Sequence, residues 1–97
     1  MKSVGYIIAC NNNIIQGIAP TVQEAWSNVV RDAGPWTGLD GKEREPDEVF
    51  NSGMYKVYPC TQGLIDFVND RGGDIFWDVE SGVACTADEQ EEFHASH

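Results

Sequence analysis

One apolar stripe, bounded at both ends, constrains the fold of this chain more than any other feature of its sequence. Between residues 22 and 33, six apolar side chains recur at the spacing of a single helix face: Val22, Ala25, Trp26, Val29, Val30 and Ala33. Thr21 and Glu24 form a capping box before the stripe, and Gly34-Pro35 ends it. A helix with one apolar face must bury it against another layer.

Alternating and β-branched segments around this helix supply that layer. Strands are expected over residues 3–10, 14–18, 54–60, 74–80 and 83–85. Thr61 begins a second main helix that ends at Gly72-Gly73. Thr86 begins a short C-terminal helix, with Glu89 completing a second capping box. The sequence therefore predicts an α+β fold, a small two-layer sandwich. Its antiparallel sheet of about four to five strands packs against two main helices and a short C-terminal helix.

The length of the chain corresponds to a single domain over residues 1–97. Its hydrophobic fraction of 41% and charged fraction of 23% are those of ordinary globular proteins, so we expect it to fold. A compact domain of this length has a radius of gyration of about 12–13 Å, and its body spans roughly 30 Å.

The longest connection, residues 34–46, is expected to be a surface loop. It contains three glycines, two prolines and charges of both signs, and such loops often carry function. Pro46 begins a short helix that runs through Phe50. Trp36 and Leu39 within the loop are candidate apolar anchors for a partner protein.

Cysteine usage favours a cytoplasmic protein. The three cysteines are an odd number and form no CxxC pair, so we expect free thiols in a reducing compartment rather than a disulfide framework. No run of about eighteen apolar residues is present, so no membrane span is expected. The apolar stretch near the N-terminus is too short for the core of a signal peptide.

No motif of a known catalytic chemistry occurs in the sequence. Nucleotide-binding glycine loops, the GxSxG elbow and the HExxH zinc motif are all missing. We therefore expect neither enzymatic activity nor a bound cofactor. Cys60, Cys85, His94 and His97 keep a metal-binding regulator open as an alternative, although the short Cys-x2-Cys spacing of zinc sites is missing.

The excess of acidic residues limits which classes of partner this protein can bind. Six Lys and Arg face sixteen Asp and Glu, which gives a net charge of −10. Binding to DNA, RNA or an anionic membrane depends on basic residues, so we expect no direct contact with any of them. A basic partner is favoured, or one whose basic groove normally holds nucleic acid.

The acids fall into two groups along the chain. Residues 72–97 contain no Lys or Arg and seven acids: Asp74, Asp78, Glu80, Asp88, Glu89, Glu91 and Glu92. Three of these are expected on the outer face of the strand over 74–80, together with Phe76. The second group lies in and after the long loop: Asp40, Glu43, Glu45, Asp47 and Glu48. These twelve acids, with Trp36 and Phe76, are the candidate partner-binding residues. A surface that serves solubility alone is the alternative interpretation of the acids.

A resemblance adds a specific expectation. The opening strand Met-Lys-Ser-Val-Gly-Tyr-Ile-Ile, the asparagine turn and the Thr-x-x-Glu-Ala-Trp helix are similar to those of many phage and prophage accessory proteins. With this length and acidity, the whole chain resembles the anti-CRISPR proteins that inhibit type I-F systems, in particular the acidic DNA mimics. The resemblance implies a non-enzymatic protein in an infected or lysogenic bacterium. Such proteins bind the RNA-guided surveillance complex at the basic site where target duplex DNA would enter.

The size of the charge limits such mimicry. Duplex DNA about 30 Å long carries about 18 charges, so a protein of net charge −10 imitates one patch only. A second hypothesis is a phage adaptor or structural protein that binds another protein through its aromatic loop. A third is the Cys/His regulator named above.

Overall fold

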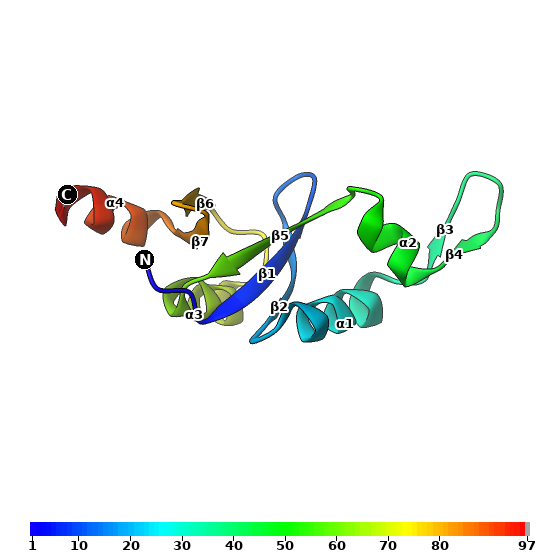
Figure 1. Ribbon diagram of the computed structural model, residues 1–97, viewed down its shortest axis with the longest axis horizontal. Helices are drawn as coiled ribbons and strands as arrows, with labels where there is room; N and C mark the ends of the chain where they lie inside the picture. Colours follow the sequence, from blue (N-terminus) through cyan, green and yellow to red (C-terminus); the bar gives the residue numbers. More distant parts are fainter. Residues whose placement is uncertain (97) are drawn as a thin grey trace.

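Five strands form the main sheet of the computed structural model, which describes residues 1–96 (Figure 1). They are β1 (Gly5–Cys10), β2 (Ile15–Ala19), β5 (Tyr55–Cys60), β6 (Trp77–Glu80) and β7 (Val83–Thr86). Their order across the sheet is β2-β1-β5-β7-β6. Three neighbouring pairs are antiparallel, but β5 and β7 run parallel, with Cys60 opposite Ala84. The predicted number of strands is confirmed, whereas the sheet is mixed rather than antiparallel throughout.

Four helices are present in the described part of the chain. They are α1 (Val22–Ala33), α2 (Pro46–Asn51), α3 (Gln62–Arg71) and α4 (Ala87–Ser96). Thr21 Oγ1 accepts the Glu24 N–H at 3.2 Å, and Thr61 Oγ1 accepts the Leu64 N–H at 3.1 Å. These threonine caps begin α1 and α3 where the sequence predicted, and the α+β class is confirmed. None of these helices is both long and apolar enough to cross a membrane.

The central strand β1 is buried on both faces. Ile7 lies in one apolar cluster with Leu64 of α3, and the adjacent Ile8 packs in another with Val29 of α1. All four side chains are completely shielded from solvent. Because neighbouring residues of a strand point to opposite faces, Ile7 and Ile8 bury different faces of β1, one in the cluster that contains α3 and the other in the cluster that contains α1.

A glycine allows α1 to approach the sheet closely. A Cβ atom on Gly17 of β2 would lie 2.4 Å from the Ala25 carbonyl oxygen and 2.6 Å from a methyl group of Val29. Any larger residue at position 17 would therefore push the helix away from the strand.

The predicted surface loop contains a two-stranded ribbon, β3 (Trp36–Thr37) and β4 (Glu43–Arg44). The Trp36 indole stacks on Trp26 of α1, with ring centroids 5.6 Å apart and planes within 3°. Phe50 of α2 and Tyr55 of β5 contact Trp26 edge-on. This aromatic cluster of Trp26, Trp36, Phe50 and Tyr55 holds the ribbon and α2 against the end of α1.

The two outer strands of the sheet approach each other at one end. Trp77 Nε1 donates a 2.7 Å hydrogen bond to the Asn13 carbonyl, and the Ile15 N–H donates a 3.0 Å hydrogen bond to the Gly73 carbonyl. The chain before β6 is therefore bonded to the β1–β2 hairpin. The predicted strand over 74–80 is correspondingly shorter and begins at Trp77.

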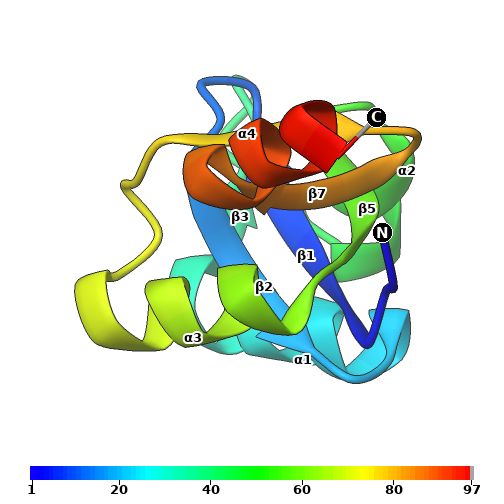
Figure 2. The ribbon, with the colours of Figure 1, turned by 90° about the vertical axis from the view of Figure 1, so that its left-hand side faces the viewer.

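The molecule is elongated, which corrects the expected span of roughly 30 Å. Its extents are 51 × 20 × 18 Å, and its radius of gyration is 14.4 Å. Figure 1 shows β6, β7 and α4 at one end of the long axis and α2 with the β3–β4 ribbon at the other. Seen from the α4 end, α4 lies beside β7, on the side opposite α1 and α3 (Figure 2).

Two leucines test the importance of the core directly. Leu64 is fully buried and Leu39 is fully exposed, so the same substitution probes both environments. We expect Leu64→Ala to lower the free energy of unfolding by about 2–5 kcal/mol, because it leaves a cavity. Leu39→Ala should change it by less than about 0.5 kcal/mol. Urea denaturation followed by circular dichroism measures both, and equal losses would contradict the described packing.

Candidate functional site

Eleven of the twelve candidate acids belong to elements at the two ends of the long axis, which Figure 1 shows, or to the chain that joins those elements. Six belong to β6 and α4: Asp78, Glu80, Asp88, Glu89, Glu91 and Glu92. Five belong to the ribbon and α2, or to the chain between: Asp40, Glu43, Glu45, Asp47 and Glu48. We call these the α4 acidic end and the α2 acidic end. The structure keeps the two sequence groups apart.

Two of the candidate binding residues predicted on the strand over 74–80 lie outside the observed strand. Asp74 and Phe76 precede β6, so Asp74 does not share a strand face with Asp78 and Glu80 as expected. The alternation of exposure nevertheless continues through this segment, since Phe76 and Asp78 are exposed while Trp77 is half-buried. Phe76 is 86% exposed, which leaves it accessible as an apolar contact.

Glu80 is held by the neighbouring helix. Its Oε2 accepts a 3.1 Å hydrogen bond from Gln90 Nε2 and lies 3.1 Å from His94 Nε2. The Gln90 hydrogen bond, with a further contribution from His94, holds the pKa of Glu80 below its ordinary value of 4.5. The side chain is only 19% exposed, so its charge is used chiefly to join β6 to α4.

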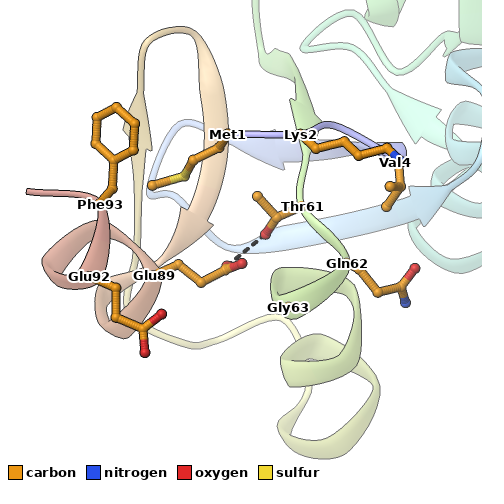
Figure 3. A pocket seen from close by; sticks show the side chains of 9 residues that line it. All are labelled: Met1, Lys2, Val4, Thr61, Gln62, Gly63, Glu89, Glu92 and Phe93. Atoms are coloured by element: carbon orange, nitrogen blue, oxygen red, sulfur yellow. Dashed lines mark hydrogen bonds between the residues drawn. The ribbon is translucent and has the colours of Figure 1, made fainter. Parts of the chain in front are cut away.

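Glu89 joins the beginnings of two helices (Figure 3). Its Oε1 accepts the Thr61 hydroxyl at 2.6 Å and the Thr86 N–H at 3.0 Å. The Glu89 N–H in turn donates to Thr86 Oγ1 at 3.1 Å, which completes the predicted capping box. A Cβ atom on Gly63 would lie 2.6 Å from Glu89 Oε2, so the carboxylate rests directly against the first turn of α3.

These contacts divide the α4 acidic end into two kinds of acid. Glu80 and Glu89 accept hydrogen bonds within the protein, which gives both a structural role that the prediction of partner contacts did not include. The capping-box pattern was the sequence signal that marked Glu89 as structural. Asp78, Asp88 and Glu91 are exposed and remain accessible to a partner.

An open groove of about 530 Å³ lies beside Glu89 (Figure 3). The N-terminal segment, the start of α3 and one side of α4 form its walls, through residues that include Met1, Lys2, Gln62 and Phe93. Thr61, at its base, is almost fully buried, accepts the Leu64 N–H and donates to Glu89. Its hydroxyl is therefore engaged in capping α3 and in bonding α4.

The buried thiols are unsuited to nucleophilic chemistry. Cys60 and Cys85 are completely shielded from solvent, whereas Cys10 is half-buried. Burial, with the nearby charge of Glu89, raises the pKa of Cys60 to about 11. The pKa of Cys85 is raised by the same two causes and by the charges of Asp78 and Glu80. Both groups are therefore neutral thiols at physiological pH.

The residues proposed for a metal-binding regulator do not assemble into a described site. No group of three or more His, Cys, Asp or Glu side chains suited to a metal occurs within residues 1–96. His94 lies against Glu80, and His97 lies outside the described residues.

At the α2 acidic end, the two apolar candidates have different environments. Trp36 is half-buried in the aromatic cluster, where its indole anchors the ribbon to α1. Leu39, in the turn between β3 and β4, is fully exposed. Asp40 Oδ1 accepts the Lys42 N–H at 3.0 Å, and Glu48 lies 4.0 Å from Arg44. The other three acids of this end are exposed: Glu43, Glu45 and Asp47.

Comparison of the chain with protein-family models, curated proteins and solved structures finds no match.

Replacing Glu89 tests whether it joins α3 to α4. We expect Glu89→Ala to lower the free energy of unfolding by about 1–2 kcal/mol, because the Thr61 hydroxyl and the Thr86 N–H lose a charged acceptor. Glu91→Ala removes the same charge from an exposed position of α4 and should change stability by less than about 0.5 kcal/mol. Thermal and urea unfolding measure the difference. Equal effects would show that charge, rather than these contacts, is responsible.

Thiol reactivity tests the described burial. At pH 8, we expect N-ethylmaleimide to modify Cys10 of the folded protein, and all three cysteines only in denaturant, as read by mass spectrometry. Because folding raises the pKa of Cys60 from 9.0 to about 11, this thiol stabilises the fold below pH 9. That contribution is lost as the pH rises toward 11. Rapid modification of Cys60 in the folded protein would contradict its burial.

Proposed function

We propose that this protein is a non-enzymatic inhibitor that occupies the basic groove of a nucleic-acid-binding protein complex. The observation that supports it is the charge of residues 72–97, which contain seven acids and no Lys or Arg. Six of these acids belong to β6 and α4, at one end of an elongated body. Carboxylates fixed on a helix and a strand present negative charge to Lys and Arg much as phosphates do.

The local charge density supports partial mimicry of a duplex. A helix of ten residues such as α4 is about 15 Å long. Duplex DNA of that length carries about nine charges, against six acids at this end. Over the whole 51 Å of the protein, a duplex would carry about 30 charges, against a net charge of −10. The proposed mimicry is therefore confined to the α4 acidic end.

The resemblance in size, charge and layout makes the type I-F CRISPR surveillance complex the first partner to test. In this proposal, Asp78, Asp88 and Glu91 pair with basic side chains that otherwise contact target duplex DNA. Phe76, exposed beside β6, supplies an apolar contact. The protein acts stoichiometrically in the cytoplasm of an infected or lysogenic bacterium and blocks target recognition.

A mobility-shift competition tests this proposal. A purified type I-F surveillance complex is incubated with the protein, and labelled target duplex is then added at two salt concentrations. We expect loss of duplex binding that weakens as salt rises, because charged pairs are screened. The triple variant Asp78→Lys, Asp88→Lys and Glu91→Lys should need at least about tenfold more protein for the same inhibition.

A matched control separates the site from the overall charge. Glu24→Lys, Asp32→Lys and Asp70→Lys change the net charge equally, at exposed positions of α1 and α3. This control should inhibit within about threefold of the original protein, since long-range steering alone is changed. Equal loss in both triple variants would reject a contact at the α4 acidic end. Unaffected duplex binding would show that the protein does not occupy the DNA-binding groove of this complex.

A further inference from the structure

A second candidate surface lies at the opposite end of the molecule. An open groove of about 400 Å³ runs between the β3–β4 ribbon and α2. We call it the ribbon groove and define it by its main lining residues: Trp36, Leu39, Arg44, Glu48, Val49 and Met54. Its volume falls within the range of about 300–1,000 Å³ that is usual for binding sites.

Apolar side chains dominate this groove although it is open to solvent. Val49 is only 4% exposed and, with Trp36, contributes the more buried part of the lining. Leu39 is fully exposed and Met54 is 47% exposed. Exposed apolar area of this kind is costly in a protein that otherwise presents charge to water, and such patches often mark contact sites.

The shape of the ribbon groove is fixed before any partner arrives. The aromatic cluster attaches Trp36 to α1, and the Trp26 ring also contacts Phe50 of α2. Within the ribbon, the Gly38 N–H donates to the Lys42 carbonyl at 2.8 Å, and the Gly41 N–H donates to the Gly38 carbonyl at 3.0 Å. A groove with ordered walls loses less conformational entropy when it binds.

The negative charge around the ribbon groove favours a basic occupant. Residues 38–48 carry five acids against Lys42 and Arg44, which leaves a local charge of −3. Arg44 lies 4.0 Å from Glu48, so the basic charge nearest the groove already has an acidic neighbour. A second copy of the chain, also of net charge −10, would be repelled. A basic partner segment suits this rim.

We propose that the ribbon groove binds a segment of a partner protein in which one large apolar side chain is flanked by Lys or Arg. The apolar side chain contacts Leu39, Val49 and Met54 and removes their surface from water. The flanking basic side chains face the acids of α2 and β4. This inference is independent of the proposed function, because the ribbon groove and the α4 acidic end lie at opposite ends of the molecule (Figure 1).

Peptide titration tests the proposed contact. The probes are the peptide KKLKK and a control of equal charge, KKSKK, added to the isotope-labelled full chain and followed by two-dimensional amide NMR. We expect KKLKK to give saturable shifts, with millimolar affinity, at amides lining the ribbon groove. KKSKK should give small, non-saturating shifts at both acidic ends, because charge alone attracts it.

Variants identify the side chains involved. The double variant Leu39→Ser and Met54→Ser changes exposed positions, and we expect it to weaken KKLKK binding at least about fivefold while the remaining spectrum is preserved. Val4→Ser, which changes an exposed apolar residue outside the ribbon groove, should leave the affinity unchanged. Equal shifts from the two peptides, no saturation by KKLKK, or unchanged affinity of the double variant would each overturn the proposal.

Discussion

Burial of β1 on both faces is the constraint on which the rest of this structure depends. A strand whose adjacent residues, Ile7 and Ile8, are both excluded from water requires cover on each side. Helices α1 and α3 provide it from different parts of the chain. The acidic ends extend from this central region in opposite directions, so the core separates two surfaces that are adjacent in neither sequence nor space.

Some acids of the α4 acidic end stabilise the fold, and others remain exposed to solvent. Glu80 and Glu89 use their charge inside the protein, where each accepts hydrogen bonds from neighbouring residues. Asp78, Asp88 and Glu91 keep theirs in solvent. A count of acidic residues therefore overstates the surface available to a partner, although every carboxylate contributes to the field at this end.

Local chemistry accounts for what the sequence predicted. The helix starts at Thr21, Thr61 and Thr86 were predictable because each hydroxyl oxygen accepts a backbone N–H only three residues further along the chain. The parallel β5–β7 pairing was missed because it depends on where α3 packs. The ribbon was missed because two-residue strands show no alternation. The packing of Trp36 was missed because it depends on stacking with Trp26, ten residues away. The 51 Å length was missed because chain length alone does not determine how the elements are arranged.

The parallel pairing has a consequence for dynamics. β7 joins β5 at the single register pair Cys60–Ala84, and Glu89 ties α4 to the start of α3. The unit of β6, β7 and α4 is therefore held to the rest of the protein by this strand pair, by Glu89 and by the Trp77–Asn13 hydrogen bond, while its acids repel one another. Cations that screen this repulsion would stabilise the folded form of the unit. Any ligand that binds only this folded form would therefore also slow amide hydrogen exchange within it.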